Sequence, residues 1–464
     1  MLFNSWIFFL FLPLVFTGYF LLPHRWRWIL LLLASYVFYG WWKWQFVIIL
    51  MFTTVMDYTC ALKIDGASTP RTKKQWLILS LGLNLSILFF FKYFYFFIGS
   101  TQFLQDLVNP HQTLKEMVEF LGKALPVGIS FYTFQSMSYT LDVYYGRAFP
   151  ERSLKQFAVF VSYFPQLVAG PIERFTHLNE QLKKKQILSY VNLQSGFRLM
   201  LYGFFVKMVI ADNLSYTVSS VFNEPGKWYF YWDMIGVCSF AFQIYADFFG
   251  YSLIAQGVAK LFGIDLMDNF NRPYLALNIT DFWKRWHISL TTWFRDYLYI
   301  PLGGNRVSKG RWVYNIMLVF LLSGLWHGAN YTFIIWGALH GIYYLIERFS
   351  PFKIKNKGIS MLLTFVAVVI AWVFFRAIDT TQALNVLKGM SGMLDGQRQL
   401  DTQPYIYLLL LIFGALELFR RNARFDHFCA QFNGLQRWTL YCFLLFCILV
   451  LCGTEYQPFI YFRF

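Results

Sequence analysis

The stretch Leu321–Trp336 reads L-L-S-G-L-W-H-G-A-N-Y-T-F-I-I-W and places one histidine, His327, between two apolar runs. Residues 312–326 carry no charged side chain, and residues 331–345 carry none apart from a histidine at position 340. Such runs are typical of the hydrocarbon interior of a bilayer, where an ionisable group costs about 2.5 kcal/mol or more unless it has a partner. His327 is therefore either a functional residue or a buried histidine that hydrogen-bonds between helices.

The composition of the whole chain agrees with a membrane location. Of the 464 residues, 57% are hydrophobic and 14% are charged, and the mean hydropathy is +0.45. Soluble domains carry roughly 25% charged residues. Phe, Tyr and Trp together make up 22% of the chain, which fits aromatic belts at the two water boundaries of membrane helices. The fold class predicted is an all-α polytopic membrane protein.

Thirteen apolar segments predict the positions of the membrane helices. They are residues 2–22, 28–42, 44–62, 76–98, 125–144, 155–170, 196–212, 230–250, 312–326, 331–347, 359–375, 405–419 and 438–455. A crossing needs about 20 residues, and one or two segments are too short or too polar, so about eleven spans are expected. Residues 2–22 lack a basic leader and run into Pro23, so they are interpreted as the first span rather than a cleaved signal.

Clusters of basic residues predict the orientation, because cytoplasmic loops carry an excess of Lys and Arg. The clusters are Arg25 and Arg27; Lys63, Arg71, Lys73 and Lys74; Arg147, Arg152 and Lys155; Lys183, Lys184 and Lys185; Lys284, Arg285, Arg295, Arg306, Lys309 and Arg311; Lys353, Lys355 and Lys357; and Arg420, Arg421, Arg424 and Arg437. Placing them in the cytoplasm puts the N-terminus outside. Segment 155–170 must then enter and leave on one side, with Pro165, Gly170 and Pro171 breaking its helix.

The net charge of +16 is mostly accounted for by these clusters. Topology and anionic lipid headgroups explain it better than nucleic acid, so the bilayer is the expected partner of this charge. Six cysteines, at positions 60, 238, 429, 442, 447 and 452, form no C-x-x-C pair. They are interpreted as small hydrophobic residues rather than disulfides or metal ligands.

A second histidine lies in the stretch 280–299, T-D-F-W-K-R-W-H-I-S-L-T-T-W-F-R-D-Y-L-Y. One continuous helix would place six residues on one face at i, i+3, i+4 and i+7 spacing. They are Trp283, Trp286, His287, Leu290, Phe294 and Tyr297. We expect such a helix to lie in the membrane interface with this aromatic face toward the protein. His287 is then either a functional group or part of the aromatic stripe of an anchoring helix.

Motifs narrow the chemistry that a membrane histidine can perform here. No H-E-x-x-H, G-x-S-x-G or G-x-x-x-x-G-K-[ST] sequence is present, so a zinc protease, a serine hydrolase and a P-loop ATPase are not indicated. Seven histidines without clustered ligands predict no metal site. Two tasks remain: general-base catalysis of acyl transfer from a thioester, and proton-coupled transport. The residues alone do not decide between acyl transfer and proton-coupled transport.

Six blocks of sequence resemble the membrane-bound O-acyltransferase (MBOAT) family. They are L-P-V-G-I-S-F-Y-T-F-Q (125–135), F-P-Q-L-V-A-G-P-I-E-R (164–174), W-K-R-W-H-I-S-L (283–290), F-R-D-Y-L-Y-I-P-L-G-G-N (294–305), L-W-H-G-A-N (325–330) and P-F-I-Y-F-R-F (458–464). Together they span most of the chain and are specific. They look closest to the bacterial branch that includes the alginate O-acetyltransferase membrane subunit and its peptidoglycan- and cellulose-acetylating relatives.

The resemblance implies a single membrane domain over residues 1–464, with a catalytic core at about 125–347 and a ring of tilted helices around a central tunnel. His327 matches the catalytic histidine of the family, and His287 matches the second histidine of the pair. The implied donor is cytoplasmic acetyl-CoA, as a substrate rather than a bound cofactor. The implied acceptor is a periplasmic acetyltransferase that passes the acetyl group to a polysaccharide outside a bacterial inner membrane.

Five further residues are candidates for the wall of the tunnel: Asn330, Asp247, Gln243, Trp326 and Trp286. Asp247 and Gln243 interrupt the apolar run 230–250, and Asn330 follows the turn at His327. Each could line a tunnel or hydrogen-bond a histidine. For Asp247, a hydrogen bond between helices is the other interpretation.

Two other features have both a structural and a functional interpretation. Glycines four residues apart flank His327 and also His340, and such pairs favour close packing of membrane helices. Packing alone is the simpler interpretation for His340. Glu173 and Arg174, beside Pro171, form either a local ion pair at the cytoplasmic mouth or part of the functional machinery.

Overall fold

The computed structural model describes residues 1–100, 126–168, 170–352, 354–394, 396–400, 404–420, 423–453 and 457–462. A few features of the sequence analysis therefore lie outside the described residues. They are Leu125 and Ala169 of the motif blocks, Lys353 and Arg421 of the basic clusters, residues 454 and 455 of the last apolar segment, and residues 463–464 of the C-terminal block.

Helices make up all the named elements of the described residues, and the chain divides into two compact units. The first unit holds residues 1–197 and 255–267. Its helices are α1 (Trp6–Leu21), α2 (His24–Gly40), α3 (Gln45–Asp65), α4 (Pro70–Leu88) with a π-helical turn (Phe89–Tyr93), α5 (Phe94–Ser100), α8 (Ile129–Tyr144), α9 (Leu154–Ser162), α10 (Phe164–Leu167) and α11 (Phe175–Lys183). Two helices, α12 (Tyr190–Phe204) and α14 (Phe230–Leu261), each contribute residues to both units.

The second unit holds residues 198–254 and 268–464. Its elements are the π-helix η2 (Phe205–Ala211), α13 (Asp212–Asn223), the 3₁₀ turn η3 (Pro273–Leu275), α15 (Ile279–Arg285), α16 (Ile288–Phe294), the π-helix η4 (Arg295–Tyr299), α17 (Lys309–His327), α18 (Tyr331–Phe349), α19 (Lys357–Arg376), α20 (Thr380–Met390), α21 (Tyr405–Phe419), α22 (Phe425–Ala430), α23 (Gly434–Leu451) and η5 (Ile460–Phe462). Both histidines of the motif blocks belong to this unit.

The all-helical membrane fold class is confirmed. Six continuous helical stretches of the described residues are long and apolar enough to cross a bilayer. They are Gln45–Asp65, Pro70–Tyr93, Tyr190–Asn223, Phe230–Leu261, Lys357–Arg376 and Gly434–Leu451. Two shorter apolar helices, Trp6–Leu21 and Tyr405–Phe419, accompany them. The total of about eleven spans and the central tunnel stay predictions.

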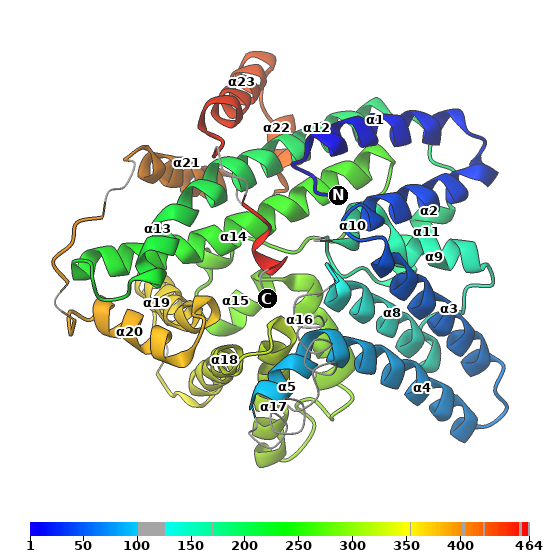
Figure 1. The fold of residues 1–464 in the computed structure, drawn as a ribbon, viewed down its shortest axis with the longest axis horizontal. Coiled ribbons are helices and arrows are strands. Elements are labelled where there is room, and N and C mark those ends of the chain that lie inside the picture. The colour runs from blue at the N-terminus through cyan, green and yellow to red at the C-terminus, as the bar shows by residue number, and fades with distance from the viewer. Residues whose placement is uncertain are drawn as a thin grey trace, which may run out of the picture. The chain divides into compact units, whose positions relative to one another are not determined.

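A polar cluster joins three helices inside the first unit, where Figure 1 shows α3, α4 and α8 side by side. Asp57 of α3 is fully buried and accepts hydrogen bonds from the Ser80 hydroxyl (2.7 Å) and the Asn84 amide (2.9 Å), both on α4. The Ser136 hydroxyl of α8 also donates to Asp57. Because lipid offers no water to a carboxylate, these donors satisfy Asp57 and join the three helices.

Segment 155–170 forms two short helices rather than one span. The nine-residue α9 is about 14 Å long, less than half of a hydrocarbon core of about 30 Å. The helix α9 ends before Tyr163, two residues before the predicted helix breaker Pro165. Beyond this point the Phe164 amide donates to the Ser35 hydroxyl of α2 (3.1 Å). Its short length is compatible with the one-sided path expected for this segment.

The contact between α17 and α18 is the closest helix packing around His327. A Cβ atom on Gly324 would collide with the carbonyl oxygen of Phe333, and one on Gly337 would collide with the carbonyl oxygen of Phe320. The two glycines face each other across the helix pair. The close packing predicted from the glycine spacing is confirmed, and it brings the α18 side chains against the end of α17.

The prediction of one helix over residues 280–299 is wrong. The chain forms α15, a break at Trp286 and His287, then α16 and η4. Helical periodicity continues through the break, but the Ile288 amide donates to the Asn269 carbonyl (2.9 Å) instead of to a residue one turn back. A tertiary hydrogen bond has overridden the local pattern. Burial still follows the predicted face at Trp283, Trp286, His287, Leu290 and Phe294, whereas Tyr297 is only half-buried.

Gly324→Ala tests the α17–α18 contact. The added methyl group must push against the Phe333 carbonyl, so we expect a loss of stability of about 1–3 kcal/mol. The measurement is the Tm of the detergent-solubilised protein. Gly310→Ala, on the first turn of the same helix with no atom within 4 Å of its new Cβ, is the matched control and should not lower Tm. Equal Tm values for the two variants would contradict the packing role.

Candidate functional site

His327 is the last residue of α17, and only 3% of it is exposed. The helix ends there because Gly328 is extended (φ −167°, ψ 154°), and α18 starts three residues later. The carboxyl end of a helix carries a partial negative charge, which favours a positive charge on a nearby side chain. The backbone around His327 is therefore suited to an imidazole that takes up a proton.

His287 lies between α15 and α16 in the left-handed region, with φ +42° and ψ 55°. A non-glycine residue there costs of order 1–3 kcal/mol, so neighbouring structure must hold it. Two backbone hydrogen bonds of 2.9 Å do so: Ile288 donates to the Asn269 carbonyl, and Asn271 donates to the Arg285 carbonyl. The Ser289 hydroxyl also donates to the Asn269 side chain (2.6 Å).

The break in the helix brings the two histidines together. Their ring centroids are 6.5 Å apart, with 60° between the ring planes. The ring of Trp326 lies 6.0 Å from His287 and 4.9 Å from His327. The ring of Tyr461 lies 6.4 Å from His287 and 5.7 Å from His327. The two imidazoles therefore share two aromatic neighbours, Trp326 and Tyr461.

Further aromatic rings enclose each histidine. Phe248 of α14 lies 4.7 Å from His287, while Trp336 of α18 and Phe375 of α19 lie 5.1 and 5.2 Å from His327. All of these side chains belong to the second unit, and we call the two histidines with these aromatic neighbours the histidine chamber. In such surroundings the effective dielectric constant is low, so hydrogen bonds and developing charges interact more strongly than in water.

Tyr461 is a member of this chamber to which the sequence assigned no role. Its position depends on Asp247, which accepts a hydrogen bond from the amide of the adjacent Ile460 (2.6 Å). Figure 1 shows this C-terminal turn, in red, beside α14. The contact joins residues 213 positions apart, so helical periodicity could not have revealed it.

Asp247 is itself held by a buried cation that sequence reasoning missed. Lys207 of the π-helix η2 lies 2.6 Å from Asp247 and 2.6 Å from Asp212, with 1% of its side chain exposed. Its ammonium also donates to the Gln457 carbonyl (3.3 Å) at the start of the C-terminal turn. Asp247 therefore makes an interhelical contact, with Lys207 of η2. Because Asp247 also accepts the Ile460 amide, the ion pair supports the turn that carries Tyr461.

The other tunnel candidates, Trp286, Gln243 and Asn330, each have a structural environment of their own. Trp286 is buried against Trp372 (4.8 Å) and Phe270 (5.1 Å), behind His287. Gln243 is half-buried one turn before Asp247. Asn330 caps α18 by accepting from the Thr332 amide (3.1 Å) and donates to the Ile378 carbonyl (2.6 Å), so its side chain holds the turn after His327.

His340 is fully buried, yet it packs as an aromatic residue. Its ring lies 4.9 Å from Trp283 and 4.9 Å from Trp336. Neither ring nitrogen has a hydrogen-bond partner among the described residues. This geometry agrees with the packing interpretation of the second glycine-flanked histidine.

A cavity of about 400 Å³ opens between α15, α16, α17 and α18. It is lined by Thr280, Trp283, Lys284, Ile288, Leu290, Thr291, Thr292, Phe294, Arg295, Tyr299, Ile316, Val319, Phe320, Ser323 and Tyr344. Ile288 directly follows His287, and Ser323 lies one helical turn before His327. Lys284 and Arg295 are exposed members of the lining. The lining therefore combines exposed positive charge with residues that neighbour the two histidines in the sequence, although neither histidine is part of it.

His287 lies outside the six helices that could cross a membrane. Burial lowers the pKa of its imidazole to about 3, because the charged form loses its hydration. At neutral pH the ring is uncharged and has one N–H donor and one nitrogen acceptor. It can donate a hydrogen bond to a carbonyl oxygen without carrying a charge itself.

Fold and site together define an all-helical membrane protein with two buried histidines in an aromatic chamber. The sequence profile described as MBOAT, membrane-bound O-acyltransferase family, matches residues 9–378, more than half of the chain and both histidines. The chain therefore belongs to the membrane-bound O-acyltransferase family and is an O-acyltransferase by class. The resemblance seen in the motif blocks is confirmed.

Three relatives illustrate the range of this similarity. The chain is 39% identical to the probable alginate O-acetylase AlgI of Pseudomonas putida, with 100% of both chains covered. It is 39% identical to the peptidoglycan O-acetyltransferase of Helicobacter pylori, over 85% of this chain and 80% of the relative. It is 29% identical to the teichoic acid D-alanyltransferase of Bacillus subtilis, over 57% of this chain and 69% of the relative.

Lys207→Met tests the support beneath the C-terminal turn. The substitution leaves Asp247 and Asp212 buried without their shared cation, so we expect a stability loss of about 3–5 kcal/mol. The measurement is Tm in detergent. Lys227→Met removes a cation from an exposed pair with Glu224 and should leave Tm unchanged, because surface pairs contribute little. A Tm for Lys207→Met as high as that of the control would contradict the structural role of the buried pair.

Proposed function

We propose that the protein moves an acetyl group from cytoplasmic acetyl-CoA across the bacterial inner membrane for O-acetylation of an extracytoplasmic polysaccharide. The proposed acceptor at the outer face is a periplasmic acetyltransferase that passes the group on. The observation that carries the proposal is the histidine pair, with ring centroids 6.5 Å apart in a chamber of aromatic rings. Family membership supports the reaction class, and the closeness of the two histidines supports a role for each in it.

The names of the relatives support a polymer as the final acceptor. They describe transfer to alginate, to peptidoglycan and to teichoic acid. The alginate and peptidoglycan enzymes are named for O-acetyl transfer, and both are 39% identical to this chain. None of the three is named for transport, so the transport alternative that the residues left open gains no support.

The cavity beside the chamber is the proposed access route of the donor. Coenzyme A carries phosphates, which suit Lys284 and Arg295, and a long pantetheine arm, which suits the largely apolar walls. The thioester would then approach Ile288 and Ser323, next to the two histidines. Both cations belong to a basic cluster expected in the cytoplasm, which agrees with a cytoplasmic donor and with an N-terminus outside.

His327 is the proposed general base. It removes the proton from the acceptor hydroxyl as the hydroxyl oxygen attacks the thioester carbonyl carbon. The tetrahedral intermediate collapses by breaking the carbon–sulfur bond, and the departing thiolate takes the proton back from the imidazolium. The products are the O-acetyl ester and coenzyme A, and no further reactant is consumed. The position at the carboxyl end of α17 favours the transient positive charge.

His287 is the proposed partner that holds the thioester carbonyl. Its neutral ring offers one N–H to the carbonyl oxygen, whose negative charge grows in the tetrahedral intermediate. The left-handed turn, braced by Asn269 and Asn271, fixes the direction of the ring before the substrate arrives. A donor fixed in advance costs no reorganisation during the reaction.

His327→Ala should abolish acetyl transfer, because the substitution removes the proposed general base. The measurement is single-turnover transfer from radiolabelled acetyl-CoA by purified protein, with Tm as a check on folding. His427→Ala, a histidine with 72% of its side chain exposed, is the matched control and should keep wild-type transfer. Transfer by the His327 variant at the control's rate would refute the assignment of the base.

His287→Gln should lower kcat by about 10²-fold while leaving the affinity for acetyl-CoA nearly unchanged. Glutamine keeps a hydrogen-bonding group, but it cannot reproduce the ring direction set by the left-handed turn. Comparing the single-turnover rate with the dissociation constant of the donor separates the two effects. If the variant lost only Tm and transferred acetyl groups normally per folded molecule, His287 would be an anchoring residue instead.

A further inference from the structure

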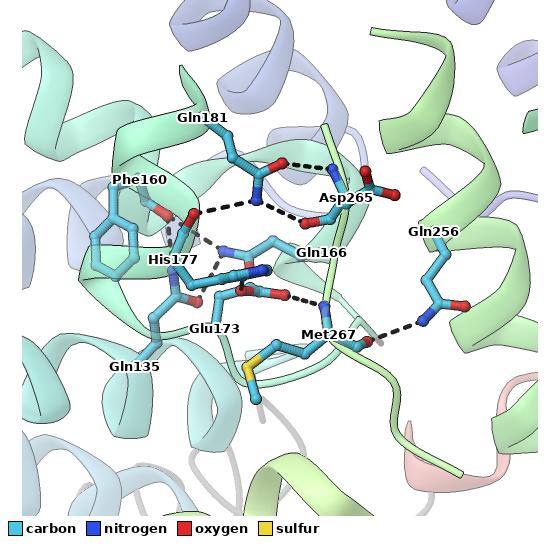
Figure 2. Close-up of polar contacts among 9 residues, drawn as sticks. All are labelled: Gln135, Phe160, Gln166, Glu173, His177, Gln181, Gln256, Asp265 and Met267. Atoms are coloured by element: carbon cyan, nitrogen blue, oxygen red, sulfur yellow. Dashed lines mark hydrogen bonds and ion pairs between the residues drawn. The ribbon is translucent and has the colours of Figure 1, made fainter. Parts of the chain in front are cut away.

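A buried carboxylate in the first unit binds the backbone of residues 265–267, a segment between helices, as Figure 2 shows. Glu173 has no exposed surface. One of its oxygens accepts the amide of Met267 at 2.6 Å, and the other lies 2.7 Å from the Nδ1 atom of His177, four residues later on α11. The local contacts of Glu173 are therefore with His177 and with the backbone amide of Met267.

Two glutamines complete this contact, which we call the 265–267 clamp. The Gln181 side chain accepts from the Asp265 amide (2.8 Å) and donates to the Asp265 carbonyl (2.9 Å). The Gln256 side chain, from α14, donates to the Met267 carbonyl (2.9 Å). Side chains thus satisfy the amide and the carbonyl of both Asp265 and Met267 (Figure 2).

Burying a carboxylate is costly unless it is paired and hydrogen-bonded. In the clamp, the cost is offset only while the Met267 amide and His177 stay in place, because each supplies a donor to Glu173. Glu173 therefore holds the Met267 amide through a buried acceptor whose other oxygen contacts His177.

The restrained segment leads directly to the strained histidine turn. Two residues after Met267, the Asn269 carbonyl accepts the Ile288 amide, and its side chain accepts the Ser289 hydroxyl. Two residues further on, the Asn271 amide donates to the Arg285 carbonyl. Every one of these bonds flanks His287, whose φ of +42° needs external support.

We propose that Glu173, together with His177, is a positioning residue for His287: the 265–267 clamp fixes the backbone from which Asn269 and Asn271 brace the histidine turn. The proposal extends the proposed function by adding a residue that touches neither substrate nor reacting atoms. Its structural part, restraint of the 285–289 turn by Glu173, holds independently of which acyl group the protein transfers.

The charges that face this pair determine its dependence on pH. Arg174, His177, Asp265 and Glu180 are the charged or titratable groups around Glu173 and His177. The hydrogen bond to Glu173 raises the pKa of His177, and burial raises the pKa of Glu173. Stabilisation by protonated His177 is therefore present below its ordinary pKa of about 6.5 and is lost as pH rises through the raised value.

The test compares Glu173→Ala, Glu173→Gln and Glu180→Ala in the full-length protein in detergent. Glutamine can still accept from the Met267 amide and donate to His177, so it should rescue the clamp. Glu180 is an exposed carboxylate on α11, the helix that carries His177, and is the matched control. The first readout is amide hydrogen exchange of peptides covering residues 265–271 and 285–290, which needs no substrate.

We expect Glu173→Ala to speed exchange in both peptides by about tenfold or more, with Glu173→Gln and Glu180→Ala close to wild type. Faster exchange at 265–271 alone would overturn the proposal, because the clamp would then be local. Unchanged exchange in both peptides would overturn it as well. These outcomes stand even if the wild-type protein transfers no acetyl group, so they are independent of the proposed function.

The second readout is catalytic. Misplacing a catalytic group by about 1 Å can cost about 10²-fold in rate, so Glu173→Ala should lower kcat by about 10- to 10²-fold with an unchanged KM for acetyl-CoA. Glutamine should restore most of this loss. A Tm loss accompanied by wild-type kcat per folded molecule would show that Glu173 stabilises the fold without positioning His287, and would overturn the proposal.

Discussion

The contact of α17 with α18 at Gly324 and Gly337 is the constraint on which the surroundings of His327 depend. Two membrane helices gain no hydrophobic energy by leaving lipid for each other, so close packing must hold them together. The absence of both Cβ atoms lets the backbone of one helix touch that of the other. As a result Trp336 lies against His327, and the histidine is enclosed at the point where α17 ends.

The parts of the structure that were predictable are those governed by local pattern. Uninterrupted apolar runs located α17 and α18 within three residues of their ends, and His327 is the last residue of α17. Charge-free segments also revealed the helical membrane class. These features depend on residues close together in the sequence, because a helix in lipid must satisfy its backbone hydrogen bonds within the same segment.

The parts that could not be predicted depend on contacts between distant residues. The break at His287 has no local signal, because the helical pattern runs through it and the competing donor and acceptor lie at Asn269 and Asn271. Lys207 and Tyr461 reach the site through bonds that join α14, η2 and the C-terminal turn. A lysine in an apolar run indicates only that a partner exists, not where the partner lies.

Ionisable residues inside the helices serve different purposes, and their burial alone does not identify a catalytic site. Asp57 is satisfied by hydroxyl and amide donors from two other helices. Lys207 is satisfied by two carboxylates. His340 needs neither, because an uncharged imidazole packed among aromatic rings costs far less than a buried ion. His287 and His327 differ from these residues in lying near each other, with their ring centroids 6.5 Å apart.

The strain at His287 has a purpose that a regular helix could not serve. In a continuous helix over 280–299, the direction of the His287 ring would be set by its helix face and would follow any movement of that helix. Breaking the helix instead leaves the turn hydrogen-bonded to Asn269 and Asn271, which lie 14 to 19 positions earlier in the sequence. The strain of about 1–3 kcal/mol is offset by three hydrogen bonds around the turn. The chamber thereby holds one imidazole at a helix end and the other in a braced turn, with 6.5 Å between the ring centroids.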